Sequence, residues 1–160
     1  SFLNVEKDNV PEVVRKCWYS MHNIRAQRYA HNKNANIKMA VIVQKMITPE
    51  VSGVAFSAHP VSGDKNSMVI EAVLGSNELL VQGAITPDHY VINKNFEILN
   101  KKTVPQNGVN RQKLSDSQLR EVALSVVEAS RFFNVDVDVE WAIEGGKFYI
   151  LQCRPITTIR

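Results

Sequence analysis

The stretch Asp136–Arg154, D-V-D-V-E-W-A-I-E-G-G-K-F-Y-I-L-Q-C-R, predicts a β-hairpin with a turn at its glycine pair. Successive side chains of a strand point to opposite faces of a sheet. In the first half of the stretch, Val139 and Trp141 therefore share an apolar face, whereas Asp138 and Glu140 share a polar face. One face of the hairpin suits a core, and the other carries groups that can do chemistry.

The second half of the stretch alternates in the same way. The alternation assigns one face to Tyr149, Leu151 and Cys153, and the other to Phe148, Ile150, Gln152 and Arg154. A two-residue Gly-Gly loop would slip every cross-strand pair by one position relative to a three-residue loop, and would mix apolar with polar side chains. We therefore predict a three-residue loop at residues 145–147. The pairs that this register predicts are Val139 with Cys153, Trp141 with Leu151, and Glu140 with Gln152.

The composition is that of an ordinary globular domain: 160 residues, 44% hydrophobic and 22% charged. A net charge of +3 without a run of Lys or Arg gives no reason to expect a nucleic-acid partner. No apolar run is long enough to span a bilayer and no signal peptide is visible, so we expect no membrane association. Cys17 and Cys153 lack the spacing of metal ligands. We expect them to be buried free thiols in a reducing, cytoplasmic environment.

Upstream of the hairpin the chain predicts one helix and several strands. An amphipathic helix begins near Val10 and ends near His31. The nearly continuous apolar run Lys38–Ile47 predicts a strand buried on both faces. Further strands are expected at Gly53–Ala58, Met68–Val73, His89–Asn93 and Phe96–Lys101, with a short helix or turn at Leu79–Val81.

The region before the hairpin combines a loop with a second helix. Val104–Leu114 contains polar residues, a glycine and a proline, and is expected to be a surface loop. Ser115 and Gln118 have the spacing of a capping box, which predicts a helix over about residues 116–133. The whole pattern predicts an α+β domain with a mainly antiparallel sheet and flanking helices. The chain starts with Ser1 rather than Met, so we expect it to be a piece of a longer polypeptide.

The polar face of the hairpin offers two interpretations. The oxygens of Glu140 and Gln152 are hard ligands that suit Mg²⁺ together with phosphate oxygens. Arg154 on the same face could bind phosphate and neutralise charge during phosphoryl transfer. The alternative is a solvated sheet face with a cross-strand pair of Asp138 and Arg154, and the pattern alone favours this alternative.

Two upstream features are compatible with nucleotide binding. The end of the apolar run, Gln44–Ile47, could present backbone groups to a flat heterocycle between Met46 and Ile47. Arg25 could reach an anion from the edge of the first helix. A core strand that ends in a turn and a solvated helix face explain the same residues, and the pattern alone favours these explanations.

Four segments carry a family resemblance, in this order: A-V-I-V-Q-K-M-I, S-G-V-A-F-S-A-H-P-V-S-G-D, L-L-V-Q-G-A-I-T-P-D-H-Y-V-I and D-V-E-W-A-I-E-G-G-K-F-Y-I-L-Q-C-R-P-I-T. They resemble the ATP-binding domain of the phosphoenolpyruvate synthase and pyruvate phosphate dikinase family, which includes the rifampicin phosphotransferases. The likeness is greatest to the pyruvate, water dikinase members, and it spans Phe2 to Thr157.

The resemblance implies an ATP-grasp fold, with residues 1–37 ending a first subdomain and residues 38–160 forming a second. It implies ATP and Mg²⁺ as cofactors. The implied roles are adenine contact for Gln44, Lys45, Met46 and Ile47, nucleotide contact for Glu78, phosphate contact for Arg25 and Arg154, and Mg²⁺ binding for Glu140 and Gln152. One departure is that the G-L-G-E of the family is here Gly75-Ser76-Asn77-Glu78, without the second glycine.

The activity that the resemblance implies belongs to a larger enzyme. Such an enzyme moves phosphoryl groups from Mg-ATP through a phosphohistidine domain to pyruvate, and yields phosphoenolpyruvate, AMP and phosphate. The upstream phosphate-binding lysine and glycine-rich loop, the phosphohistidine domain and the pyruvate-binding domain are absent from the 160 residues. We therefore expect this chain alone to be inactive. The alternatives are the nucleotide domain of a rifampicin-type antibiotic phosphotransferase and a non-catalytic nucleotide-binding module.

Overall fold

A computed structural model describes residues 1–22, 38–108 and 110–157. The chain forms two units, Ser1–Met46 and Ile47–Arg160, which are described separately. In the first unit, a short 3₁₀ turn, η1 (Lys7–Asn9), leads into helix α1 (Val10–Tyr19), which is followed by η2 (Ser20–His22). The predicted helix therefore begins where expected, and its predicted end lies outside the described residues. No described helix has the length and apolar character needed to cross a membrane.

The predicted strand at Lys38–Ile47 does not form. These residues adopt no regular secondary structure, and Ile42 (85%) and Val43 (66%) are largely exposed. A strand is stable only when its backbone N–H and C=O groups are paired, and no described strand pairs with this segment. Apolar composition indicated burial correctly at Ile47, which is 8% exposed, but composition does not supply a pairing partner.

The second unit is a six-stranded sheet in the order β4-β3-β2-β1-β5-β6, with every neighbouring pair antiparallel. The strands are β1 (Val51–Phe56), β2 (Ser67–Leu74), β3 (Asp88–Asn93), β4 (Ile98–Lys102), β5 (Val137–Glu144) and β6 (Lys147–Pro155). This arrangement confirms the predicted α+β class. β1 lies at the centre, where Gly53 makes room for a neighbour: a Cβ there would lie 2.8 Å from the ring of Trp141.

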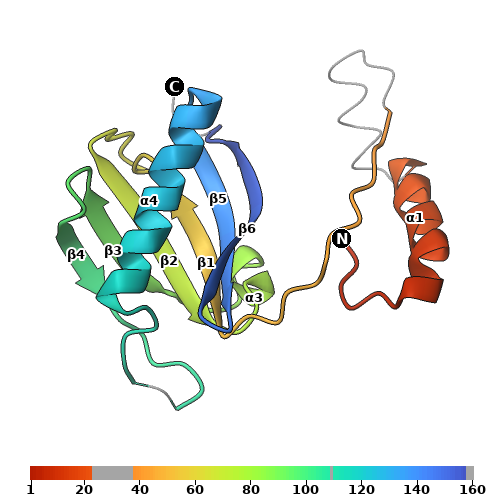
Figure 1. The fold of residues 1–160 in the computed structure, drawn as a ribbon, viewed down its shortest axis with the longest axis horizontal. Helices are drawn as coiled ribbons and strands as arrows, with labels where there is room; N and C mark the ends of the chain where they lie inside the picture. The colour runs from red at the N-terminus through yellow and green to blue at the C-terminus, as the bar shows by residue number, and fades with distance from the viewer. Residues whose placement is uncertain (23–37, 109, 158–160) are drawn as a thin grey trace. The chain divides into compact units, whose positions relative to one another are not determined.

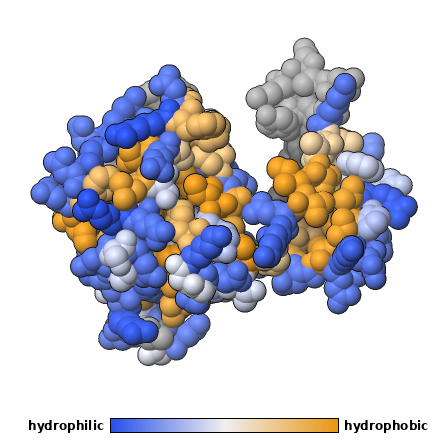
Figure 2. Space-filling view, in the orientation of Figure 1, coloured by the Kyte–Doolittle hydropathy of each residue, from blue (hydrophilic) through white to orange (hydrophobic). Residues whose placement is uncertain are grey.

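Helix α4 (Asp116–Phe133) covers one face of the sheet (Figure 1). The predicted capping box is present, since Ser115 Oγ accepts from the Gln118 N–H at 3.3 Å and the Gln118 side chain accepts from the Ser115 N–H at 2.9 Å. The buried stripe of the helix consists of Leu119, Val122, Ala123 and Val126. The helix ends at exposed aromatic residues, Phe132 (83%) and Phe133 (54%), where Figure 2 shows apolar atoms at the surface.

The β5–β6 hairpin has the predicted pairing of Glu140 with Gln152, but not the predicted turn. Glu144 pairs with Lys147, so the loop is the two-residue Gly145-Gly146. Both glycines have positive φ, 58° and 73°, as a type I′ hairpin turn requires. The three-residue loop predicted from the sequence is therefore wrong.

A β-bulge reconciles this turn with the pairing of Glu140. The register shifts between Glu140 and Trp141, and Trp141 pairs with Ile150 rather than with Leu151. Leu151 is thus the extra residue of β6, and it restores the register for the remainder of the strand. The register predicted from the sequence rests on unbroken alternation, which a bulge interrupts.

The bulge also changes which side chains of β6 face the core. Phe148 and Cys153 both pack against the core cluster, although strict alternation placed them on opposite faces. Phe148 stacks on Trp141 with ring centroids 6.2 Å apart. Cys153, like Cys17, is a free thiol that is half-buried rather than buried, and burial raises the pKa of the Cys153 thiol.

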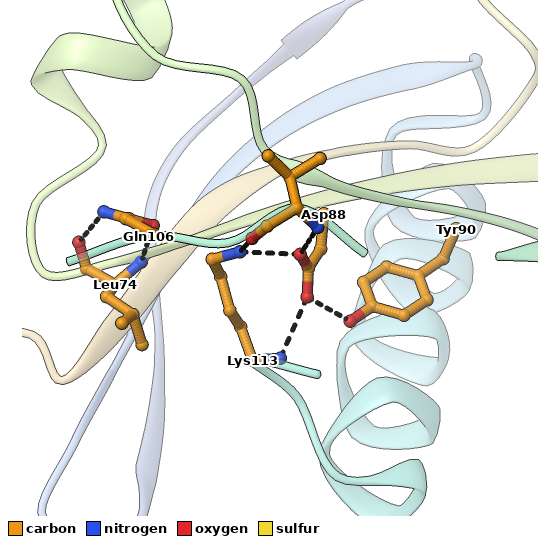
Figure 3. A network of polar contacts seen from close by, with 6 residues as sticks. Leu74, Asp88, Tyr90, Gln106 and Lys113 are labelled. Carbon is orange, nitrogen blue, oxygen red and sulfur yellow. Dashed lines mark hydrogen bonds and ion pairs between the residues drawn. The ribbon is translucent and has the colours of Figure 1, made fainter. Parts of the chain in front are cut away.

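The region predicted as a surface loop contains a buried ion pair. Lys113 Nζ lies 2.6 Å from Asp88 Oδ1, and both side chains are fully buried (Figure 3). Asp88 also accepts from the Tyr90 hydroxyl at 2.9 Å and from the backbone N–H groups of Val104 and Lys113. Burial opposes ionisation of this carboxyl group, but these four donors together lower the pKa of Asp88. The loop is therefore fastened to β3 through a charge that the sequence pattern assigned to the surface.

Candidate functional site

The face of the sheet opposite α4 carries three of the predicted site residues, Glu140, Gln152 and Arg154. Val139 and Trp141 of β5 face the core under α4, so Glu140, which lies between them, points to the other face. Cross-strand partners share a face. Glu140 is paired with Val54 of β1 on one side and with Gln152 of β6 on the other. These residues form one row on the face opposite α4.

Glu140 and Gln152 lie close enough together to share a metal ion. They are directly opposite, which places their Cβ atoms about 5 Å apart. Glu140 is half-buried and Gln152 is exposed, so both side chains can reach a ligand above the sheet. Among the described residues, no group of three or more His, Cys, Asp or Glu side chains is placed to hold a metal ion. Two oxygen ligands fit the sparse protein coordination that Mg²⁺ usually has when phosphate oxygens and water complete its shell.

Arg154 extends the polar face by one more row. Its Nε and one terminal nitrogen lie 2.8 and 2.7 Å from Asp138 Oδ2. The cross-strand pair that the alternation allowed is therefore present. This ion pair uses only some of the five N–H donors of the guanidinium, and the Arg154 side chain is 62% exposed. Arg154 can thus hold Asp138 and still bind an anion.

A contact that sequence reasoning missed joins the loop after β2 to this face. Asn77 Nδ2 donates to Glu140 Oε2 at 3.2 Å. Asn77 is 8% exposed and has φ −79° and ψ 3°, a conformation open to any residue, so the backbone there does not need the glycine of the family pattern. Gly75, which is retained, has φ 76°. The replacement of a glycine by Asn was visible in the sequence, but its partner 63 positions away was not.

Glu78, the other residue predicted in this loop, is exposed and opens the short helix α3 (Glu78–Val81). Its backbone N–H donates weakly to Ser76 Oγ at 3.4 Å. Arg25 lies outside the described residues. The loop after β2 therefore contacts Glu140, a candidate metal ligand, through Asn77. The role of Glu78 stays a prediction.

The predicted adenine segment has a mixed environment. Gln44, Lys45 and Met46 are exposed and belong to the first unit, whereas Ile47 is buried in the second. Just beyond Ile47 the chain is fastened to the hairpin turn: the Thr48 N–H donates to Glu144 Oε1 at 2.7 Å.

A second bond runs the other way, from the Gly145 N–H to Glu50 Oε1 at 3.0 Å. We call this pair of contacts the Glu50–Glu144 clamp. The Glu144 carboxylate thus accepts from the segment that leads into β1, and the Glu50 carboxylate accepts from the hairpin turn. The entry to β1 is therefore held at one place relative to the β5–β6 turn.

Residues 1–160 match the family described as pyruvate phosphate dikinase, AMP/ATP-binding domain. The chain belongs to this family. The resemblance stated from the sequence motifs is thereby confirmed, as is the nucleotide-binding character of the domain.

The chain is similar to much longer proteins. It is 42% identical over its full length to a probable phosphoenolpyruvate synthase of Archaeoglobus fulgidus, of which it covers 24%. It is 33% identical, over 96% of the chain, to the phosphoenolpyruvate synthase of Pyrococcus furiosus, of which it covers 22%. It is also 30% identical to the rifampicin phosphotransferase of Bacillus cereus, over 99% of the chain and 21% of that protein. The chain thus spans about a quarter of the length of these relatives.

Proposed function

We propose that the sheet face opposite α4 binds the phosphates of Mg-ATP in a phosphotransferase. The observation that carries the proposal is the pairing of Glu140 with Gln152 across β5 and β6, with Arg154 one row away on the same face. A scaffold would need neither this oxygen pair nor an exposed arginine beside it.

Each residue has a distinct role in the proposal. Glu140 and Gln152 would hold Mg²⁺, which would neutralise charge on the phosphates. Arg154, and Arg25 from the first unit, bind phosphate oxygens and stabilise the charge of the transferring group. The backbone of Gln44, Lys45, Met46 and Ile47 contacts adenine, and Glu78 contacts the nucleotide. Positioning and electrostatics supply most of the catalysis.

For the whole protein we propose a pyruvate, water dikinase. Its phosphohistidine and pyruvate-binding domains, in other parts of the same polypeptide, would carry phosphoryl groups from ATP to pyruvate, releasing AMP and phosphate. The 42% identity to a probable phosphoenolpyruvate synthase supports this acceptor. We place the reaction in the cytoplasm, where ATP is available and the free thiols Cys17 and Cys153 stay reduced.

The similarity to a rifampicin phosphotransferase supports one rival acceptor. The decisive test supplies the full-length protein with Mg-ATP and either pyruvate or rifampicin, and measures AMP and the phosphorylated product. Formation of phosphoenolpyruvate with pyruvate supports the proposal. If only rifampicin is phosphorylated, rifampicin replaces pyruvate as the proposed acceptor. If neither compound is phosphorylated, a non-catalytic nucleotide-binding module is favoured.

The 160-residue chain provides a complementary test. We expect it to bind ATP weakly and to convert no pyruvate, since the family's upstream lysine and glycine-rich loop are not among its residues. Calorimetric titration with ATP, with and without Mg²⁺, measures the affinity. Tight binding by the chain alone would favour an independent nucleotide-binding module.

A further inference from the structure

Asn77 precedes helix α3 but does not cap it. An Asn at this position usually accepts a hydrogen bond from the backbone of the first helical turn. Here the side chain makes no such bond, and Nδ2 donates instead to Glu140 Oε2 at 3.2 Å. With 8% of Asn77 exposed, this donor reaches Glu140 from a largely buried position. The side chain of Asn77 is thus committed to a carboxylate on another element.

The loop that carries Asn77 is anchored at its start. Gln106 clamps the backbone of Leu74 by accepting from its N–H at 2.8 Å and donating to its carbonyl at 3.0 Å (Figure 3). The next residue, Gly75, donates its N–H to the carbonyl of Glu50 at 2.9 Å. Because these residues are fixed, Asn77 is presented to Glu140 from a defined position.

The contact with Asn77 gives the two oxygens of the Glu140 carboxylate different environments. Oε2 accepts from Asn77, and no described residue donates a hydrogen bond to Oε1. A carboxylate held in this way loses part of its rotational freedom and keeps one oxygen for a ligand. Partners of this kind orient metal ligands, and their removal typically weakens metal binding by about 10- to 100-fold.

We propose that Asn77 is a positioning residue that orients the Glu140 carboxylate toward the divalent cation of the nucleotide site. The inference rests on the proposed function. It concerns this chain in particular, since the G-L-G-E pattern places at the same position a glycine, which has no side chain to donate.

The test uses the full-length protein, a non-hydrolysable ATP analogue and Mn²⁺ as the metal probe. Nucleotide affinity is measured by calorimetry in excess chelator and then at increasing Mn²⁺, and bound Mn²⁺ is followed by electron paramagnetic resonance. The variants are Asn77→Leu, which keeps the volume without the donor, and Asn77→Gly, which restores the family residue. Ser76→Ala, an exposed position in the same loop, is the matched control, and Glu140→Gln tests the metal site itself.

Added Mn²⁺ should raise the nucleotide affinity. We expect both Asn77 variants to need about 10- to 100-fold more Mn²⁺ to reach half of the maximal gain in affinity. Nucleotide affinity in chelator and the melting temperature should stay close to those of the Ser76→Ala control. Unchanged Mn²⁺ dependence in both Asn77 variants would overturn the inference. So would an equal loss of affinity with and without metal, because that loss indicates a structural role for the loop.

The Glu140→Gln variant separates failure of the inference from failure of the proposed function. If it shifts the Mn²⁺ dependence and the Asn77 variants do not, only the positioning role of Asn77 is refuted. If it also leaves the Mn²⁺ dependence unchanged, the metal site is refuted, and the role of Asn77 with it.

Discussion

Glu140 and Gln152 are directly opposite on β5 and β6 because Leu151 is an extra residue in β6. The Gly145-Gly146 turn alone would pair Glu140 with Leu151, an apolar side chain. The bulge therefore brings the two candidate metal ligands into one row while the turn keeps its two-residue form.

Deletion of Leu151 tests this relationship. Without it, Ile150 would still pair with Trp141, and Gln152 would follow directly to pair with Glu140. We expect the shortened hairpin to keep the pairing of Glu140 with Gln152, seen as cross-strand backbone contacts by nuclear magnetic resonance. Deletion of Gln152 is the matched control, since it puts Leu151 opposite Glu140. Pairing of Glu140 with any residue other than Gln152 in the Leu151 deletion would contradict the assignment of Leu151 as the extra residue.

Gly53 and Gly145 predict two different costs for the same substitution. In Gly53→Ala the new Cβ would lie 1.8 Å from the backbone oxygen of Glu71, so the central strands must separate, at a cost of about 3 kcal/mol or more. Gly145→Ala has open space but a φ of 58°, which costs about 1–2 kcal/mol. Urea unfolding measures both values. Equal destabilisation would contradict the close approach at Gly53.

The buried pair of Asp88 and Lys113 predicts a large effect of single substitutions. Lys113→Met leaves the Asp88 carboxylate buried without its cation, and we expect a loss of about 3–5 kcal/mol in the free energy of unfolding. The double variant Asp88→Asn with Lys113→Met removes both charges and should recover part of this loss. A double variant less stable than Lys113→Met would contradict this account.

The same pair predicts the response to acid. Because the pKa of Asp88 is lowered in the folded state, its contribution to stability is complete above the unfolded pKa of about 3.9. It is lost as the pH falls through the lower folded pKa. Below about pH 4, the free energy of unfolding should therefore fall more steeply in the unmodified protein than in the double variant. Parallel curves, measured by urea unfolding over this range, would contradict it.

Arg154 should matter to activity far more than to stability. The Arg154 side chain is 62% accessible and the Asp138 side chain only 11%, so we expect loss of this ion pair to cost about 1–2 kcal/mol. In the proposed role, Arg154→Ala should lower kcat of the full-length enzyme by about 10³-fold. Lysine keeps the charge but not the planar fork, so Arg154→Lys should recover only part of the rate. A fall in melting temperature with unchanged kcat would refute the role.

Local rules predicted the elements that depend on local chemistry. The capping box at Ser115 and Gln118 marked the start of α4, and the alternation around Glu140 identified the polar face. The bulge at Leu151 could not be predicted in this way, because it satisfies the turn geometry and the packing of Cys153 against the core together. Each of these conditions, taken alone, predicts a different register.

Two other features depend on partners distant in the sequence. Lys38–Ile47 has strand composition, but no described strand pairs with it, so its apolar residues alone do not predict its structure. The polar residues, glycine and proline of Val104–Leu114 predict a surface loop, and only the contact of Lys113 with Asp88, 25 positions away, accounts for the burial of Lys113. The contact between Asn77 and Glu140 is of the same kind.

The bulge at Leu151 has a further consequence for solubility. β6 is an outermost strand of the described sheet, and a regular edge strand presents a row of unpaired N–H and C=O groups to which another chain can add. The bulge interrupts that row in the middle of β6, and Pro155, the last residue of the strand, has no N–H to offer. The irregularity that aligns Gln152 with Glu140 therefore also hinders edge-to-edge aggregation.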